Sequence, residues 1–182
     1  MPRFEPLPQR RPAIVAGASS GIGAATATEL AARGFPVALG ARRVDKCQEL
    51  VDEIRSSGGE AVALPLDVTD PESVKGFVHC ATEELGDIEL LVAGAGDTFF
   101  GRLHEISTDT FESQIQIHLI GANRLAIAVL PGMVERQRGV LGRQEPRPAG
   151  AGVRRPLQNP VVGRGDAALR QLQSDPGPHR GR

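Results

Sequence analysis

A glycine-rich turn near the start of this 182-residue sequence limits its possible folds more than any other feature. Gly17, Gly21 and Gly23 come directly after residues 13–16, a short apolar run that is typical of a buried strand. The Ala-rich residues 21–33 then predict a helix. A chain that leaves a strand, turns tightly and opens a helix presents unpaired N–H groups at the positive end of the helix dipole, which favours a bound anion.

Apolar runs of strand length alternate with amphipathic stretches through residues 12–139. The expected strands are 13–16, 36–41, 61–66 and 88–93, and the expected helices are 21–33, 44–57, 71–85 and a longer one with a single apolar face from Phe111 to Val129. Strands that alternate with helices over short connections predict an α/β fold, a Rossmann-type doubly wound parallel sheet with helices on both faces.

The composition changes abruptly after Gly139. Eight arginines stand against three acidic residues in residues 139–182, and a fifth strand that begins at Val140 is not continued by residues 142–148. We therefore expect a sheet truncated after about four strands, with the edge of the fourth strand unpaired. Because residues 140–182 hold few large apolar groups, we expect them to form a disordered tail. The tail follows a nucleotide-binding domain at residues 12–139, and we expect residues 1–11 to form a flexible lead-in before that domain.

Four segments carry a family resemblance. Residues 16–23 read Ala-Gly-Ala-Ser-Ser-Gly-Ile-Gly and resemble the Thr-Gly-x-x-x-Gly-x-Gly signature of the short-chain dehydrogenase/reductase family, with alanine for threonine. Residues 66–70 resemble its adenine-ring segment, 91–96 its Asn-Asn-Ala-Gly segment, and 128–139 the end of its fifth helix and the following turn. The resemblance covers residues 12 to about 139. It implies an oxidoreductase that transfers hydride between a nicotinamide and a small carbonyl or alcohol substrate.

The resemblance also implies where a dinucleotide would lie. The implied contacts are Gly17, Ser19, Ser20, Gly21, Ile22 and Gly23 for the pyrophosphate, Asp67 and Val68 for the adenine, and Ala93, Gly94 and Ala95 for the nicotinamide ribose. Two plainer interpretations stay open. The glycines can form an ordinary strand–helix turn, and Asp67 can be a turn carboxylate that supports a helix cap at Asp70.

The end of the second expected strand indicates which cofactor is preferred. Family members that prefer NAD place an acidic residue there, bound to the ribose 2′-hydroxyl. This sequence has Ala41 followed by Arg42 and Arg43, so no carboxylate repels a 2′-phosphate and two guanidinium groups could pair with it. The sequence predicts NADP(H). The alternative is that both arginines are solvated charges at the start of the next helix, where the dipole disfavours them.

The family's catalytic residues are not found in the sequence. In the family, a Tyr donates the proton, a Lys four residues later lowers its pKa, a Ser polarises the carbonyl, and an Asn on the fifth helix holds a water. This sequence has no Tyr and no Lys after Lys75, so we expect the chain as written to be catalytically inactive. His118 stands at the Asn position. It could relay protons, since histidine has a reference pKa of about 6.5, or be a core or interface residue.

Two accounts of residues 140–182 stay open. They can be a frameshifted or alternatively spliced reading of a complete reductase gene, or a genuine basic arm on a non-catalytic dinucleotide-binding or regulatory module. The segment has no aromatic residue to stack on bases, so nucleic acid is not the expected partner. The resemblance implies a homo-oligomer built by the fifth and sixth helices. Because the sixth would follow residue 139, oligomerisation is doubtful here.

Features of the whole chain favour a cytoplasmic protein. The N-terminus lacks the apolar run of a signal peptide, and we expect no stretch to approach the length of a transmembrane helix. Cys47 and Cys80 lie far apart in no paired motif, which suits a reducing compartment with both as buried small side chains. We expect no metal site and no membrane partner.

Overall fold

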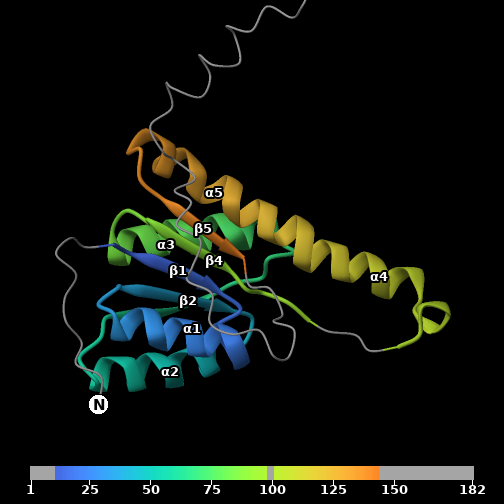
Figure 1. Ribbon diagram of the computed structural model, residues 1–182, viewed down its shortest axis with the longest axis horizontal. Helices are drawn as coiled ribbons and strands as arrows, with labels where there is room; N and C mark the ends of the chain where they lie inside the picture. Colours follow the sequence, from blue (N-terminus) through green and yellow to red (C-terminus); the bar gives the residue numbers. More distant parts are fainter. Residues whose placement is uncertain (1–10, 98–100, 144–182) are drawn as a thin grey trace, which may run out of the picture.

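The computed structural model describes residues 11–97 and 101–143 (Figure 1). The predicted lead-in lies outside these residues except for Arg11, and the predicted tail lies outside them except for residues 140–143.

The centre of the fold is a five-stranded parallel sheet with the strand order β3-β2-β1-β4-β5 (Figure 1). The strands are β1 Ala13–Ala16, β2 Val37–Ala41, β3 Ala61–Pro65, β4 Leu90–Ala93 and β5 Val140–Arg143. Every residue of β1 and β2 is buried, as expected for central strands covered on both faces. The predicted doubly wound α/β sheet is confirmed.

Helices cover both faces of the sheet (Figure 1). The helices α1 Gly21–Ala32 and α2 Val44–Ser56 pack on one face, and α3 Pro71–Leu85 and α5 Ala122–Glu135 pack on the other. Successive side chains of β1 alternate between the two cores, since Ala13 and Val15 face α1 and α2 whereas Ile14 faces α3 and α5. The alternation explains why continuous apolar runs, rather than half-polar ones, form these strands.

The two cysteines differ in their surroundings. Cys47 is fully buried between α2 and the sheet, and this burial raises the pKa of its thiol. Cys80 is exposed on α3, so the expectation that both cysteines are buried is wrong for Cys80.

The sheet has one strand more than the roughly four expected. β5 pairs in parallel with β4 from Val140 opposite Leu90 to Arg143 opposite Ala93. The predicted unpaired edge on β4 is therefore wrong. The last two residues of β5, Gly142 and Arg143, bring no large apolar side chain, but a strand ladder needs only backbone N–H and C=O groups, which both residues supply.

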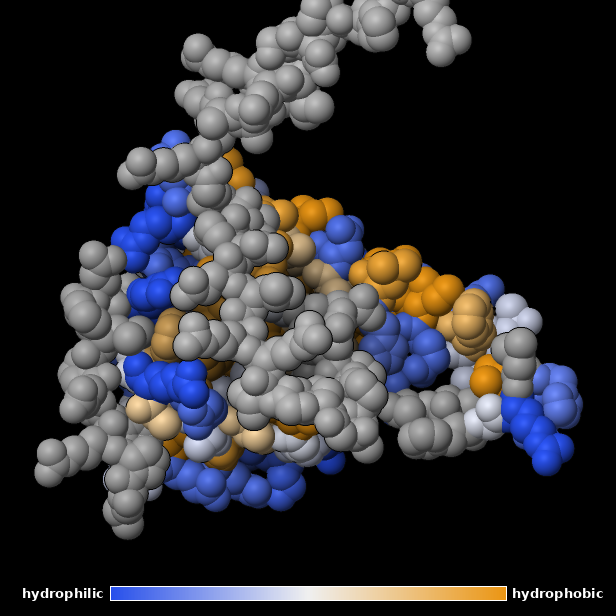
Figure 2. Space-filling view, viewed as in Figure 1, coloured by the Kyte–Doolittle hydropathy of each residue, from blue (hydrophilic) through white to orange (hydrophobic). Residues whose placement is uncertain are grey.

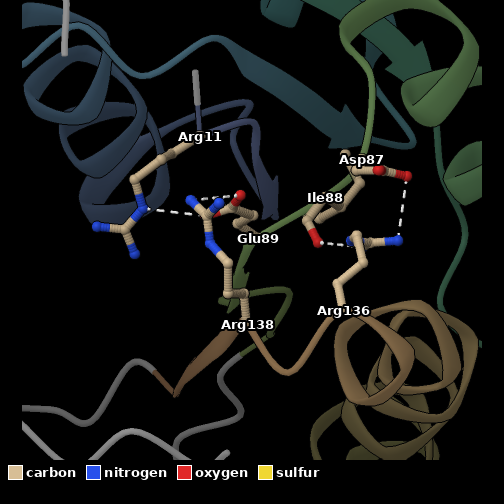
Figure 3. Close-up of polar contacts among 6 residues, drawn as sticks. All are labelled: Arg11, Asp87, Ile88, Glu89, Arg136 and Arg138. Carbon is tan, nitrogen blue, oxygen red and sulfur yellow. Dashed lines mark hydrogen bonds and ion pairs between the residues drawn. The ribbon is translucent and has the colours of Figure 1, made fainter. Parts of the chain in front are cut away.

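Glu89 anchors β5 at the amino edge of the sheet (Figure 3). Its buried carboxylate accepts hydrogen bonds from Arg11 Nε at 3.1 Å and Arg138 Nη2 at 3.1 Å. Its backbone N–H donates to Pro12 O at 2.9 Å, and its carbonyl accepts from Val140 N at 2.8 Å. One residue thus ties together the segments that enter β1, β4 and β5.

A continuous helical run from residue 108 to residue 135 follows β4. It consists of α4 Thr108–Ile115, the π-helical segment η2 Gln116–Gly121, and α5. The predicted apolar face is buried in α5, whereas α4 buries no residue and Phe111 is 54% exposed. α4 extends beyond the sheet (Figure 1), and the described element that it packs against is η2 of the same run, so its apolar residues stay exposed.

This helical run meets the length and composition of a membrane-spanning helix, so the expectation that no stretch approaches that length is wrong. The property is weak evidence of a membrane segment, because core helices of soluble proteins share it. Leu125, Val129 and Met133 are buried against the sheet and α3. The large apolar residues that this run exposes are Phe111, Ile115, Leu119, Ile127 and Val134. Figure 2 shows hydrophobic surface, in orange, along the run.

Candidate functional site

The glycine turn between β1 and α1 lies against the carboxyl end of β4. Gly17 has φ +82°, and its N–H donates to Gly40 O at 2.8 Å. A Cβ on Gly17 would lie 2.5 Å from Gly94 O and 2.7 Å from Ala95 Cα. The turn therefore requires glycine at this position for both its backbone conformation and its space.

The start of α1 is open on the side of Gly21. Gly21 has φ +58°, and a Cβ there would meet no atom of the described residues within 4 Å. Ser20 provides no side-chain cap, and the first turn of α1 contains no acidic residue. Nothing within α1 therefore offsets the positive end of its dipole. A Cβ on Gly23 would instead collide with the Gly17 carbonyl. Glycine at position 23 therefore allows α1 to pack closely on the turn.

Arg43 reaches the glycine turn from the end of β2. Its Nη2 donates hydrogen bonds to Ser19 Oγ at 3.1 Å and to Ser20 Oγ at 3.2 Å. Arg42 is also exposed. Hydrogen bonds from Thr69 lower the pKa of Asp67, and the charge of Arg42 lowers it to a smaller extent. Arg43 thus contacts the glycine turn, whereas Arg42 acts on the turn after β3 through its charge.

The turn after β3 is ordered by its own side chains. Asp67 Oδ1 accepts from Thr69 Oγ1 at 2.7 Å and from Thr69 N at 2.9 Å, and these bonds hold the pKa of Asp67 below its usual value. Asp67 N donates to Ser73 Oγ at 2.9 Å. Asp70 caps α3 separately by accepting from Glu72 N at 2.9 Å, as predicted. The described contacts of Asp67 fit the turn-carboxylate interpretation.

The end of β4 lies beside β1 at the point where the order of the strands reverses. Ala93 pairs with Ala16, and Gly94 N donates to Ala16 O at 3.1 Å. In open α/β sheets, ligands bind in the crevice outside the carboxyl ends of the strands at such a reversal. The small side chains of residues 93–96 leave the backbone close to this crevice.

His118 lies at the same edge of the sheet, although it comes from the π-helical segment. Its Nε2 is 2.7 Å from Asp97 O. A Cβ on Gly96 would lie 2.6 Å from His118 Cε1, so the imidazole packs directly on that glycine. The ring is half-buried and lies next to the predicted nicotinamide segment rather than within the core.

The structure thus brings the predicted residues to one edge of the sheet, from the ends of β1, β2, β3 and β4. Sequence reasoning missed Arg124 on α5, whose Nη1 donates to Val68 O at 3.1 Å and to Thr69 O at 3.0 Å. The Arg124–Val68 contact spans 56 positions, so no local motif could have indicated it.

Known proteins are similar to this chain in sequence. Glycine betaine reductase ATRR of Emericella nidulans is 43% identical over 127 residues, which are 70% of this chain and 10% of that protein. The uncharacterized oxidoreductase Lin0452 of Listeria innocua is 38% identical over 69% of this chain and 51% of that protein. This chain therefore spans about half the length of the second relative and a much smaller part of the first.

Solved structures are similar as well. An alcohol dehydrogenase from the archaeon Thermococcus sibiricus, complexed with 5-hydroxy-NADP, shares 36% identity at a TM-score of 0.70, covering 74% of this chain and 57% of that one. A metagenomic short-chain oxidoreductase in complex with NADP shares 31% identity at a TM-score of 0.71, covering 79% of this chain and 65% of that one. The short chain dehydrogenase family model matches residues 11–141. The chain belongs to the short-chain dehydrogenase family.

Proposed function

We propose that this chain binds NADP(H) at the carboxyl edge of its sheet, and that its gene encodes an oxidoreductase that transfers hydride between the nicotinamide and a small carbonyl or alcohol substrate. The observation that carries the proposal is the position of Arg43, which donates to Ser19 and Ser20 beside the glycine turn. A guanidinium there suits a phosphate group, because it can donate paired, charge-assisted hydrogen bonds. Two similar structures were solved with NADP or 5-hydroxy-NADP.

Each part of the cofactor has a proposed place. The pyrophosphate lies on residues 17–23, where the open side of Gly21 lets it approach the backbone and the start of α1. The 2′-phosphate lies between Arg42 and Arg43. The adenine lies by Asp67 and Val68, and the nicotinamide ribose lies along residues 93–95.

We propose that the chain as written binds the cofactor without catalysing hydride transfer. When bound, NADPH supplies the hydride, but reducing a carbonyl also requires a proton donor at the carbonyl oxygen. The sequence contains no Tyr, and its last Lys is Lys75. His118 lies near the proposed nicotinamide segment and can hold a proton at Nδ1 or Nε2. One histidine does not replace the Tyr–Lys pair, so His118 alone does not complete an active site.

The absent residues also favour a second candidate function, a non-catalytic dinucleotide-binding module that carries residues 140–182 as a basic arm. The nucleotide sequence downstream of codon 139 distinguishes this module from an altered reading of a complete reductase gene. An open frame that encodes Ser and Tyr-x-x-x-Lys there would favour the altered reading.

A carbonyl-reduction assay on the full chain tests the proposal. NADPH fluorescence is titrated with the protein, and NADPH consumption is then followed with a panel of small ketones and aldehydes. We expect saturable binding with no protein-dependent consumption. Turnover would contradict the proposed inactivity, and a folded chain that does not bind NADPH would contradict the proposed function.

A further inference from the structure

Arg124 connects α5 to the turn that follows β3. Its Nη1 donates to two consecutive carbonyl groups, those of Val68 at 3.1 Å and Thr69 at 3.0 Å. Hydrogen bonds from a charged donor are stronger than those between neutral groups. The guanidinium therefore holds two neighbouring peptide groups of the turn in fixed orientations.

The carbonyl of Asp67, the first residue of the turn, is held by the residue that follows the turn. Asp67 O accepts from Asp70 N at 3.2 Å. Because each peptide group is planar, fixing its carbonyl also fixes the direction of the N–H on the following residue. The N–H groups of the two peptide groups that Arg124 holds also donate within the turn, Thr69 N to Asp67 Oδ1 at 2.9 Å and Asp70 N to Asp67 O. The turn is therefore bonded internally, and Arg124 adds the hydrogen bonds that fix it to α5.

The same helical run contacts the turn at a second point. Val68 is only 5% exposed, and a Cβ on Gly121 would lie 2.7 Å from Val68 Cγ2. Gly121 is the last residue of the π-helical segment and is buried. Val68 therefore packs directly on the helix backbone, and Arg124 lies three residues further along. The packing of Val68 on the helix and the hydrogen bonds from Arg124 together leave the turn little freedom to move relative to α5.

We propose that Arg124 is a positioning residue for the adenine end of the cofactor: it holds residues 67–69 in their binding shape before the cofactor arrives. This inference rests on the proposed function, which places the adenine at Asp67 and Val68. A turn ordered in advance does not have to be ordered during binding, and so binding is tighter. Arg124 acts through the turn and does not itself contact the cofactor.

Binding of cofactor fragments by Arg124→Ala and Arg124→Lys tests this role. We expect R124A to bind NADPH and 2′,5′-ADP about tenfold more weakly, equivalent to about 1.4 kcal/mol, with unchanged affinity for nicotinamide mononucleotide. We expect R124K to lie between R124A and wild type, because an ammonium retains the charge and can still donate to a carbonyl. R124K also keeps the test available if R124A fails to fold.

Arg136→Ala is the matched control. Arg136 follows the same helix and also donates to a backbone carbonyl, that of Ile88 at 3.2 Å, but at the amino edge of the sheet (Figure 3). R136A should lower the melting temperature without weakening 2′,5′-ADP binding. Equal binding of 2′,5′-ADP by wild type, R124A and R124K would overturn the inference while leaving the proposed function intact. A folded wild-type chain that binds neither NADPH nor 2′,5′-ADP would overturn both.

Discussion

Gly17→Ala is expected to lower the free energy of unfolding by about 3 kcal/mol, through backbone strain and overpacking together. Gly17 has φ +82°, a conformation that costs a residue with a Cβ about 1 kcal/mol. The added methyl would also lie 2.5 Å from Gly94 O and 2.7 Å from Ala95 Cα. Both neighbours are backbone atoms next to β4, so they cannot move aside without disturbing the sheet. Urea denaturation of the two proteins measures the loss.

Gly58→Ala separates the strain from the collision. Gly58 has φ +88°, but a Cβ there would meet no described atom within 4 Å. We expect G58A to cost about 1 kcal/mol, the strain alone. Similar losses for G17A and G58A would mean that the glycine turn does not pack against β4 as described.

Changing Arg42 and Arg43 together to alanine is expected to weaken NADPH binding about 100-fold, since each charge-assisted hydrogen bond is worth about 1.5–3 kcal/mol. NADH lacks the 2′-phosphate, so its affinity should change by less than about threefold, within the small contribution of an exposed charge. Titrating both cofactors into the double variant gives the ratio directly. Equal losses for NADPH and NADH would contradict the assignment of the two arginines.

The single variants refine this assignment. Arg43→Ala should have the larger effect, because Arg43 already donates to Ser19 and Ser20 beside the glycine turn. Arg33→Ala is the control: Arg33 is an exposed arginine that pairs with Glu29 on α1, and its removal should leave both cofactor affinities unchanged.

Most of the fold could be predicted because local patterns determine it. The buried runs of β1 and β2, the Asp70 cap and the glycine turn are all short-range features, and each lies where the sequence placed it. β5 could not be recognised beyond Leu141, because its pairing depends on backbone groups and on the contact of Arg138 with Glu89. A contact across 49 positions leaves no local pattern.

The helical run after β4 also shows that a local pattern does not determine which residues are buried. A regular helical period correctly predicted burial of Leu125 and Val129, but it also placed Phe111 on the buried face. The period gives the spacing of the apolar face but not the length of helix that the sheet covers, and α4 lies beyond the sheet (Figure 1). At the site, the family resemblance indicated the residues around the glycine turn. The role of Arg124 could not be predicted, because it depends on the packing of α5 beside residues 67–69.

The proposed phosphate cradle at residues 17–23 is tested most directly by calorimetric titration of NADPH into the full chain and its Gly21→Ala variant. A methyl at Gly21 meets no described atom, so the variant should fold with a loss of only about 1 kcal/mol from its left-handed φ of +58°. The methyl would, however, occupy space that the pyrophosphate needs. We expect saturable binding by the wild-type chain and affinity at least about tenfold weaker in folded G21A. Equal affinities, or a folded wild-type chain that does not bind NADPH, would contradict it.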